Sequence, residues 1–355
     1  MRLARDGLNG WRLYPIKQFR ELRAVWDRLN QRSGNSPVLE SAFVSPLLHH
    51  FAKGDEIIAV HEGISDFNAM GIFRRRLNGV WDTFQPSQAP LGLWINEQDL
   101  SPVGLLRTLQ VNLPGIALSV GIQRLDSSIH LRPSDSEMCH TLDSISTYSI
   151  PVHGKFDDYW LLCSKNLRKN LRRQFNKLAR LGVNVRLEQV TQEFEIGSVL
   201  REYGGLESSG WKGQAGTAVH PDNVQGRFYR EVLEVFCSTK RCVVFQYKFD
   251  DKVVAMDLCI VSNGVLINLK SAYDESIKSM SPSMLMLHDY LKLAFDQGAA
   301  SRIEFLGPEM EWNTQWAGES RKLYHINHHR WPWISSVIRA PVMSVIRRRI
   351  ATRAG

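Results

Sequence analysis

The sequence predicts a mixed α/β protein with two domains, and three observations carry this prediction. The chain has 355 residues, and chains of this length usually fold into more than one domain, each with its own hydrophobic core. Apolar residues recur at spacings of three and four over residues 165–181, which indicates an amphipathic helix. Residues 265–305 read as strand, loop, helix and strand, and the two strands of such a unit are expected to be parallel.

We expect an N-terminal domain over residues 1–150, a second domain over 151–335 and a basic tail over 336–355. The first domain opens with a helix over 16–34 and a loop over 35–46. Its remaining expected elements are strand-like runs near 56–63, 69–85, 116–126 and 146–152, with a hairpin turn at Asn78-Gly79 and a helix near 101–113.

The second domain is expected to begin with a helix that Ser164 caps and Gly182 ends. A three-strand meander is expected further along, with turns at Asp250-Asp251 and Asn263-Gly264. The other expected elements are a strand over 183–190, helices over 198–210, 226–239 and 283–298, and strands over 302–307 and 322–331.

The positive charge is concentrated in two segments. The formal net charge is +8, yet residues 164–186 and 321–355 each hold eight Lys or Arg and no acid, so the rest of the chain sums to −8. Each segment suits phosphates on a cofactor, an RNA or an anionic membrane surface. The sequence shows neither a secretory signal nor a membrane span, and its five cysteines form no CxxC pair, which favours a cytoplasmic protein with reduced thiols.

Several stretches resemble a known family. They are "NLRKNLRRQFNKLARLG", "LESSGWKGQAGTAV", "LKSAYDESIKSMSPSMLML" and "FLGPEMEWNTQW". They look like the GNAT-related acetyltransferases associated with bacterial cellulose and exopolysaccharide synthesis, which are similar in turn to the Fem-type aminoacyltransferases. The resemblance covers about residues 150–320 and extends more weakly over 10–150. It implies tandem GNAT-like domains, each a mostly antiparallel sheet with flanking helices.

The loop that opens the helix over 283–298 is the expected cofactor site. A helix N-terminus offers backbone N–H donors and a favourable dipole to an anion. Ser281 is expected to cap this helix, Pro282 suits its first position, and Ser283 offers a further hydroxyl. The resemblance implies that Met280, Ser281, Pro282, Ser283 and Met284 hold the pyrophosphate of acetyl-CoA or another acyl-CoA. The family typically has glycine at the position of Ser283. The competing interpretation is an ordinary helix start.

Other residues are candidates for catalysis and for acceptor binding. Glu207 is a candidate general base, Asp257 a further catalytic candidate, and Tyr273 a candidate acid for the departing thiolate. Candidate substrate-binding residues are Trp211, Lys212, Asp274, Asn313 and Trp316; Trp312-Asn313 stands where the family has roughly Tyr-Lys. For each of them a structural role is the alternative.

The basic helix over 165–181 is expected to bind an anion through Arg168, Lys169, Arg172 and Arg173. The candidates are the CoA 3′-phosphate, a lipid-linked sugar pyrophosphate and an aminoacyl-tRNA; the alternative is a solvated face.

His325, His328 and His329 alternate along one strand, which is poor geometry for a metal, so no metal is expected. Residues 330–350, which are rich in Trp and Arg, could lie in a membrane interface or pack against the domain as a terminal segment.

The expected function is acyl transfer from acyl-CoA to an amine or hydroxyl of a saccharide or cell-envelope precursor, by direct attack in a ternary complex. The alternatives are a Fem-type transferase that uses aminoacyl-tRNA and a non-catalytic GNAT module in a polysaccharide-synthesis complex. The expected partners are a saccharide or lipid-linked precursor, with peripheral contact to an anionic membrane or to that complex, and no DNA.

Overall fold

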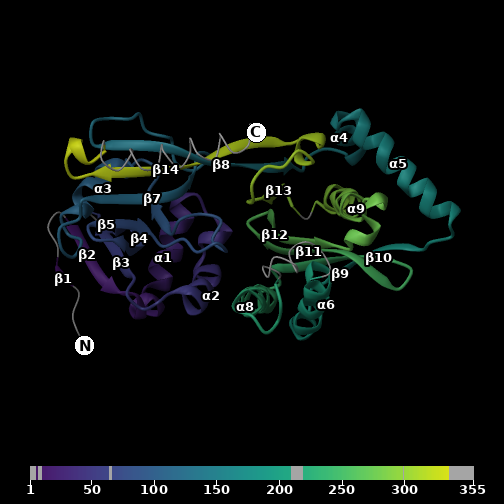
Figure 1. Ribbon diagram of the computed structural model, residues 1–355, viewed down its shortest axis with the longest axis horizontal. Coiled ribbons are helices and arrows are strands. Elements are labelled where there is room, and N and C mark those ends of the chain that lie inside the picture. The colour runs from purple at the N-terminus through teal and green to yellow at the C-terminus, as the bar shows by residue number, and fades with distance from the viewer. Residues whose placement is uncertain (1–4, 7–9, 64–65, 209–218, 299, 336–355) are drawn as a thin grey trace, which may run out of the picture. The chain divides into compact units, whose positions relative to one another are not determined.

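The structure, a computed structural model, describes residues 5–6, 10–63, 66–208, 219–298 and 300–335 (Figure 1). Contacts between residues divide the chain into two compact units. Unit 1 comprises Met1–Ile145 with Lys322–Gly355, and unit 2 comprises Ser146–Arg321. The sequence placed the boundary near residue 150 and assigned the strand over 322–331 to the second domain. The structure groups that strand with unit 1, because it pairs antiparallel with a unit 1 strand, from Leu323↔Asp126 to His329↔Ser119.

Unit 1 is a mostly antiparallel sheet with helices packed on it. Its sheet order is β1-β2-β3-β4-β5-β7-β14, with β6 paired to β4. Its strands are β1 (Arg5–Asp6), β2 (Trp11–Pro15), β3 (Ile57–Glu62), β4 (Phe67–Leu77), β5 (Val80–Thr83), β6 (Trp94–Asn96), β7 (Ser119–Asp126) and most of β14 (Glu319–His329). Its helical segments are η2 (Ile16–Gln18), α1 (Phe19–Ser33), η3 (Pro37–Leu39), α2 (Ser41–Phe51) and α3 (Pro102–Gln110).

Local sequence signals explain most of unit 1. The Asn78-Gly79 turn joins β4 to β5 as predicted, with Gly79 at φ 78°. The loop expected over residues 35–46 is wrong: α2 begins at Ser41, and Pro46 lies inside it. Phe43, Val44 and Leu47 are buried, so packing of one apolar face stabilises this helix despite the proline.

Unit 2 has the sheet order β8-β13-β12-β11-β10-β9. The strands are β8 (Cys139–Pro151, which begins in unit 1), β9 (Val185–Val190), β10 (Cys242–Phe249), β11 (Lys252–Ser262), β12 (Val265–Tyr273) and β13 (Arg302–Phe305). The helical segments are α4 (Phe156–Leu162), α5 (Lys165–Arg180), η4 (Glu193–Glu195), α6 (Ile196–Ser208), α8 (Val224–Ser238), η5 (Glu275–Met280), α9 (Pro282–Gln297) and η6 (Asn313–Gln315). Figure 1 shows α9 on one face of the β10–β12 sheet and α6 and α8 on the other.

The elements predicted for unit 2 are confirmed. Strands β10, β11 and β12 form an antiparallel meander, and its turns place Asp250 and Asn263 at φ 55° and 53°. Strands β12 and β13 are parallel, as the strand–helix–strand pattern requires. Ser164 caps α5, since its Oγ accepts the Leu167 N–H at 3.2 Å. The expected mixed α/β fold with mostly antiparallel sheets is therefore confirmed.

Candidate active site

The candidate site of unit 2 lies where β12 and β13 separate. The parallel pairing runs from Val265↔Arg302 to Asn268↔Phe305, where β13 ends, while β12 continues to Tyr273. Beyond Asn268, β12 therefore has no β13 residue beside it, and α9 begins nearby. Ligands in such sheets bind at the carboxyl ends of the strands, beside the N-terminus of the following helix.

A cavity of about 320 Å³ occupies this place. Its wall combines polar groups from β11 and β12, the first turns of α9, and two aromatic side chains from β13 and the segment after it. The lining residues are Asp257, Asn268, Ser271, Tyr273, Lys278, Ser281, Pro282, Ser283, Met284, Leu287, Tyr290, Phe305 and Trp312. A few polar groups converging on a mostly apolar wall are typical of a small-molecule site.

A β-bulge shapes the polar side of the cavity. The register of β11 with β12 shifts between Leu258↔Lys270 and Cys259↔Asn268, so Leu269 is the extra residue. Asn268 and Ser271 would face opposite ways in a regular strand, but here Asn268 Nδ2 lies 3.0 Å from Ser271 Oγ. The bulge therefore brings both side chains to the same cavity.

Asp257 is the buried acid of the cavity. Only 3% of the residue is exposed, and its Oδ2 accepts a hydrogen bond of 2.7 Å from Asn268 Nδ2. Its Oδ1 is buried and has no hydrogen-bond partner among the described residues. Burial raises the pKa of Asp257 to about 6, although Ser271, Tyr290 and Asn268 partly oppose the shift. A carboxyl with a pKa near neutrality in a cavity is suited to accepting a proton.

The start of α9 forms another part of the cavity wall. Ser281 has left-handed backbone angles, φ 55° and ψ 48°, and its side chain makes no capping hydrogen bond. The expectation that Ser281 caps the helix is wrong, because a capping side chain requires an extended backbone at that position. Pro282 occupies the first position, as predicted. The buried Ser283 Oγ has no partner among the described residues, so a hydroxyl remains available beside the helix start.

Three expected site residues of unit 2 are engaged elsewhere. Glu207 does not line the cavity; its Oε2 accepts the Val219 N–H at 2.6 Å, and its Oε1 lies 4.0 Å from Lys270 Nζ. Asp274 forms an ion pair of 2.6 Å with Lys252 and accepts the Ser276 N–H, and these contacts, Lys252 above all, hold the pKa of its carboxyl below the ordinary value. Met280 packs against the hydrophobic core.

The expected acceptor residues near β13 are buried. Asn313 Oδ1 accepts the Met310 N–H at 2.7 Å and so fixes the loop after β13. Trp316 belongs to the core and lies 5.9 Å from the Trp160 ring. Neither lines the cavity, whereas Trp312, one residue before Asn313, does. Trp211 and Lys212 lie outside the described residues.

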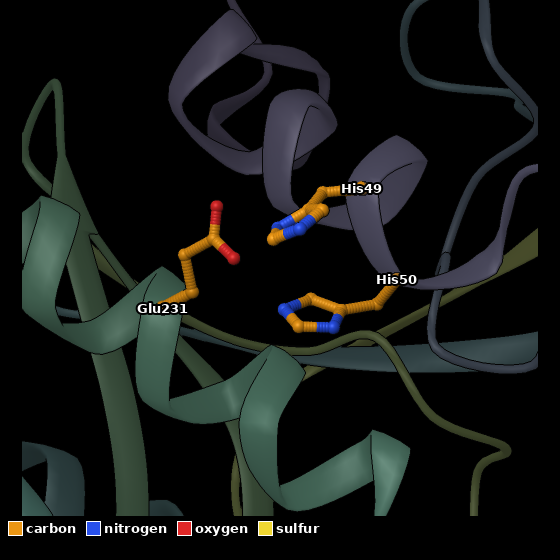
Figure 2. Close-up of side chains that lie close together, drawn as sticks. All are labelled: His49, His50 and Glu231. Carbon is orange, nitrogen blue, oxygen red and sulfur yellow. The ribbon is translucent and has the colours of Figure 1, made fainter.

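The histidines expected not to bind metal make other contacts. His325 Nδ1 accepts the Arg124 N–H at 3.1 Å, and burial lowers the pKa of His325 to about 4. His328 Nδ1 lies 2.9 Å from Gln110 Oε1. Elsewhere in unit 1, the adjacent His49 and His50 lie in the last turn of α2, with ring centroids 4.5 Å apart. Figure 2 shows both histidines and also Glu231, which belongs to α8 of unit 2.

Sequence reasoning missed several residues of the cavity wall: Asn268, Ser271, Lys278, Leu287, Tyr290, Phe305 and Trp312. The strand–helix–strand pattern located the site, but the β-bulge that turns Asn268 and Ser271 together has no short sequence signal. Tyr290 lies more than two turns inside α9, stacked on Phe245 at 4.5 Å, and its helical spacing reads as core.

A comparison with protein families gives a match to the part of the chain that contains this cavity. Residues 165–314 match the sequence profile of a family described as an acetyltransferase (GNAT) domain. No curated protein matches the chain. All the lining residues, from Asp257 to Trp312, fall within the matched range.

Solved structures share the fold over almost the whole chain. A crystal structure of FemX is 7% identical, with a TM-score of 0.55, over 92% of this chain and 99% of that chain. The C-terminal domain of a putative lysylphosphatidylglycerol synthetase from Agrobacterium fabrum is 10% identical, with a TM-score of 0.53, over 90% and 96%. L-PGS from Bacillus licheniformis is 13% identical, with a TM-score of 0.50, over 88% and 91%.

These identities are low, so the likeness to solved structures shows the fold alone. That fold is the tandem GNAT-like one expected from the sequence. Within the described part of the chain, no helix combines the length and the apolar character that a membrane span requires. Residues 165–314 of this chain thus match an acetyltransferase (GNAT) domain, and the matched range includes the cavity between β12, β13 and α9.

Proposed function

We propose that this protein is an acyl-CoA-dependent acyltransferase that transfers an acyl group, most simply acetyl, to an amine or hydroxyl of a saccharide or cell-envelope precursor. One observation carries the proposal. The residues that line the cavity at the start of α9 include three buried polar atoms without partners among the described residues: Ser283 Oγ, Asp257 Oδ1 and Tyr290 Oη. Of these, Ser283 Oγ can serve as a donor to a phosphate, and Asp257 Oδ1 can serve as a proton acceptor.

The residues at the start of α9 fit the phosphate end of an acyl-CoA. The helix dipole favours negative charge there, and Pro282 sacrifices no useful donor. Ser283 Oγ adds a hydroxyl donor, and Lys278 adds a cation at the same wall. A buried hydroxyl without a partner costs free energy, which a phosphate oxygen would recover.

The lining residues from β11 and β12 fit proton transfer. A bound acyl-CoA would supply the acyl group as a thioester. Asp257, with a pKa of about 6, is mostly ionised at neutral pH, and its free Oδ1 can accept the proton that the acceptor amine or hydroxyl loses. Tyr273, the last residue of β12, lines the same cavity and holds a phenolic proton for the departing thiolate.

Thermal unfolding with acetyl-CoA, longer acyl-CoAs and free CoA tests the proposal. A ligand at one hundred times its dissociation constant should stabilise the folded chain by about 2.7 kcal/mol. If none of these ligands raises the unfolding temperature, the proposal is wrong. If one does, radiolabelled acyl transfer to amino- and hydroxyl-bearing saccharides then identifies the acceptor class.

A further inference from the structure

Helix α5 presents a face of one charge sign. Its 16 residues include seven Lys or Arg and no acid. Leu167, Leu171, Gln174 and Leu178 are buried, and the positions opposite them are exposed. We define this exposed side as the outer face of α5; its cations are Lys165, Lys169, Arg172, Arg173 and Arg180.

The cations of α5 are not neutralised within the described part of the chain. None of the seven lies in an ion pair with a described residue, whereas several exposed cations elsewhere in unit 2 do. Lys252 and Lys292, for example, lie 2.6 and 2.5 Å from carboxylate oxygens of Asp274 and Asp296. Like charges on neighbouring turns repel one another, so an external anion would relieve this cost.

The outer face is long and firmly held. Sixteen residues of helix span about 24 Å, further than the phosphates of one CoA molecule reach. Ser164 caps the helix, and Gln174 Nε2 donates to Ser279 O at 2.9 Å, which fixes α5 beside the segment before α9. A shallow hollow of about 630 Å³ runs along Lys169, Arg172, Arg173, Asn176, Ala179 and Arg180. Figure 1 shows α5 as a long helix at the periphery of unit 2.

Exposed leucines flank the cationic face at both ends of the helix. Leu161 and Leu162, at the end of α4, are 64% and 75% exposed, and Leu181, which follows α5, is 60% exposed. The two acids of α4, Asp157 and Asp158, lie in its first turn, one turn before the leucines. Cations with bordering exposed leucines are the pattern of a surface that rests on a lipid bilayer.

We propose that α5, with Leu161, Leu162 and Leu181, docks unit 2 onto an anionic phospholipid bilayer. The cations contact headgroup phosphates and the leucines enter the acyl boundary. This surface extends beyond the acyl-transfer site and does not depend on it. RNA is the competing polyanion, but no aromatic side chain lies on the outer face to stack bases, and exposed leucines contribute nothing to phosphate-backbone binding.

Vesicle flotation of the full chain tests the proposal. The vesicles contain phosphatidylcholine alone or equimolar phosphatidylcholine and phosphatidylglycerol. The charge variant is Lys169→Glu with Arg172→Glu. Its matched control, Arg20→Glu with Arg23→Glu on α1 of unit 1, changes the net charge equally. A third variant, Leu161→Ser with Leu162→Ser, removes the apolar part, and circular dichroism checks that each variant folds.

The wild type should float with phosphatidylglycerol vesicles and not with phosphatidylcholine alone. The charge variant should lose about thirtyfold in affinity, the leucine variant about tenfold, and the α1 control much less. Equal losses in the charge variant and the α1 control would assign binding to net charge or to the basic tail and overturn the proposal. Tighter binding to a short RNA duplex, unaffected by the leucine variant, would overturn it in favour of a nucleic-acid surface.

Discussion

Asn268 Nδ2 donates a hydrogen bond of 2.7 Å to Asp257 Oδ2, while Asp257 Oδ1 stays buried without a partner among the described residues. The two side chains come from neighbouring strands, and the β-bulge at Leu269 sets their approach. A carboxylate held at one oxygen and free at the other is oriented for a ligand. This arrangement makes the chemistry of the cavity testable.

Asp257 should make the stability of the chain depend on pH. Its pKa in the folded state is about 6, against an ordinary value of 3.8, so the folded chain holds this proton more tightly than the unfolded chain. The stabilisation that this tighter proton binding gives to the folded state is complete below about pH 4 and is lost as the pH rises to about 6. The free energy of unfolding should decrease by about 3 kcal/mol over this range.

Urea unfolding between pH 4 and pH 7 checks this prediction. Asp257→Asn should remove the decrease, whereas Asp296→Asn, at an exposed carboxylate paired with Lys292, should keep it. Identical pH dependence in the wild type and Asp257→Asn would show that the carboxyl titrates normally. If Asp257 is the base, kcat/KM of the wild type should also rise through about pH 6.

Ser283→Glu should abolish binding of acyl-CoA. The new carboxylate would face the pyrophosphate at the start of α9 and repel it. Ser283→Ala is the matched control, since it removes one hydroxyl and adds no charge. Calorimetric titration with acetyl-CoA should show no heat with the glutamate variant and weakened binding with the alanine variant. Unaltered affinity in Ser283→Glu would place the phosphates at a different loop.

Glu207 should matter for stability. Its carboxylate accepts the Val219 N–H, and Glu207→Ala leaves that buried donor without a partner. We expect the free energy of unfolding to decrease by about 2–3 kcal/mol, as measured in urea. Glu207→Gln, which keeps an acceptor oxygen, should decrease it less. A loss of about 10²–10⁴ in kcat of folded Glu207→Gln would instead establish Glu207 as the general base.

Trp312 and Trp316 should respond differently to truncation. Trp312 lines the cavity, is 36% exposed and meets the Phe305 ring edge-on at 5.6 Å, so Trp312→Ala should weaken acyl-CoA binding about tenfold with little loss of stability. Trp316 is 3% exposed in the core, and Trp316→Ala should cost about 3–5 kcal/mol. The opposite pattern would mean that the cavity wall is assigned to the wrong tryptophan.

The sequence predicted one part of the cavity wall and missed most of another part. The start of α9 was predicted because a Pro after a probable turn, followed by apolar spacing, is a local signal at one place in the chain. Of the part of the wall that β11 and β12 form, only Asp257 and Tyr273 were predicted from the sequence. Asn268 and Ser271 meet only because the register shifts by one residue, and Tyr290 reaches the cavity only because α9 packs against the sheet that contains β11.

Local rules determined the elements of this protein from the sequence alone: turn residues at the meander joints, the Ser164 cap, and the order of strands and helix that makes β12 and β13 parallel. Long-range packing decided the rest. It turned residues 41–51 into a helix around Pro46, assigned β14 to unit 1, and bound Glu207 to Val219. Those outcomes depend on contacts between residues that are distant in the sequence, and local sequence patterns do not predict such contacts.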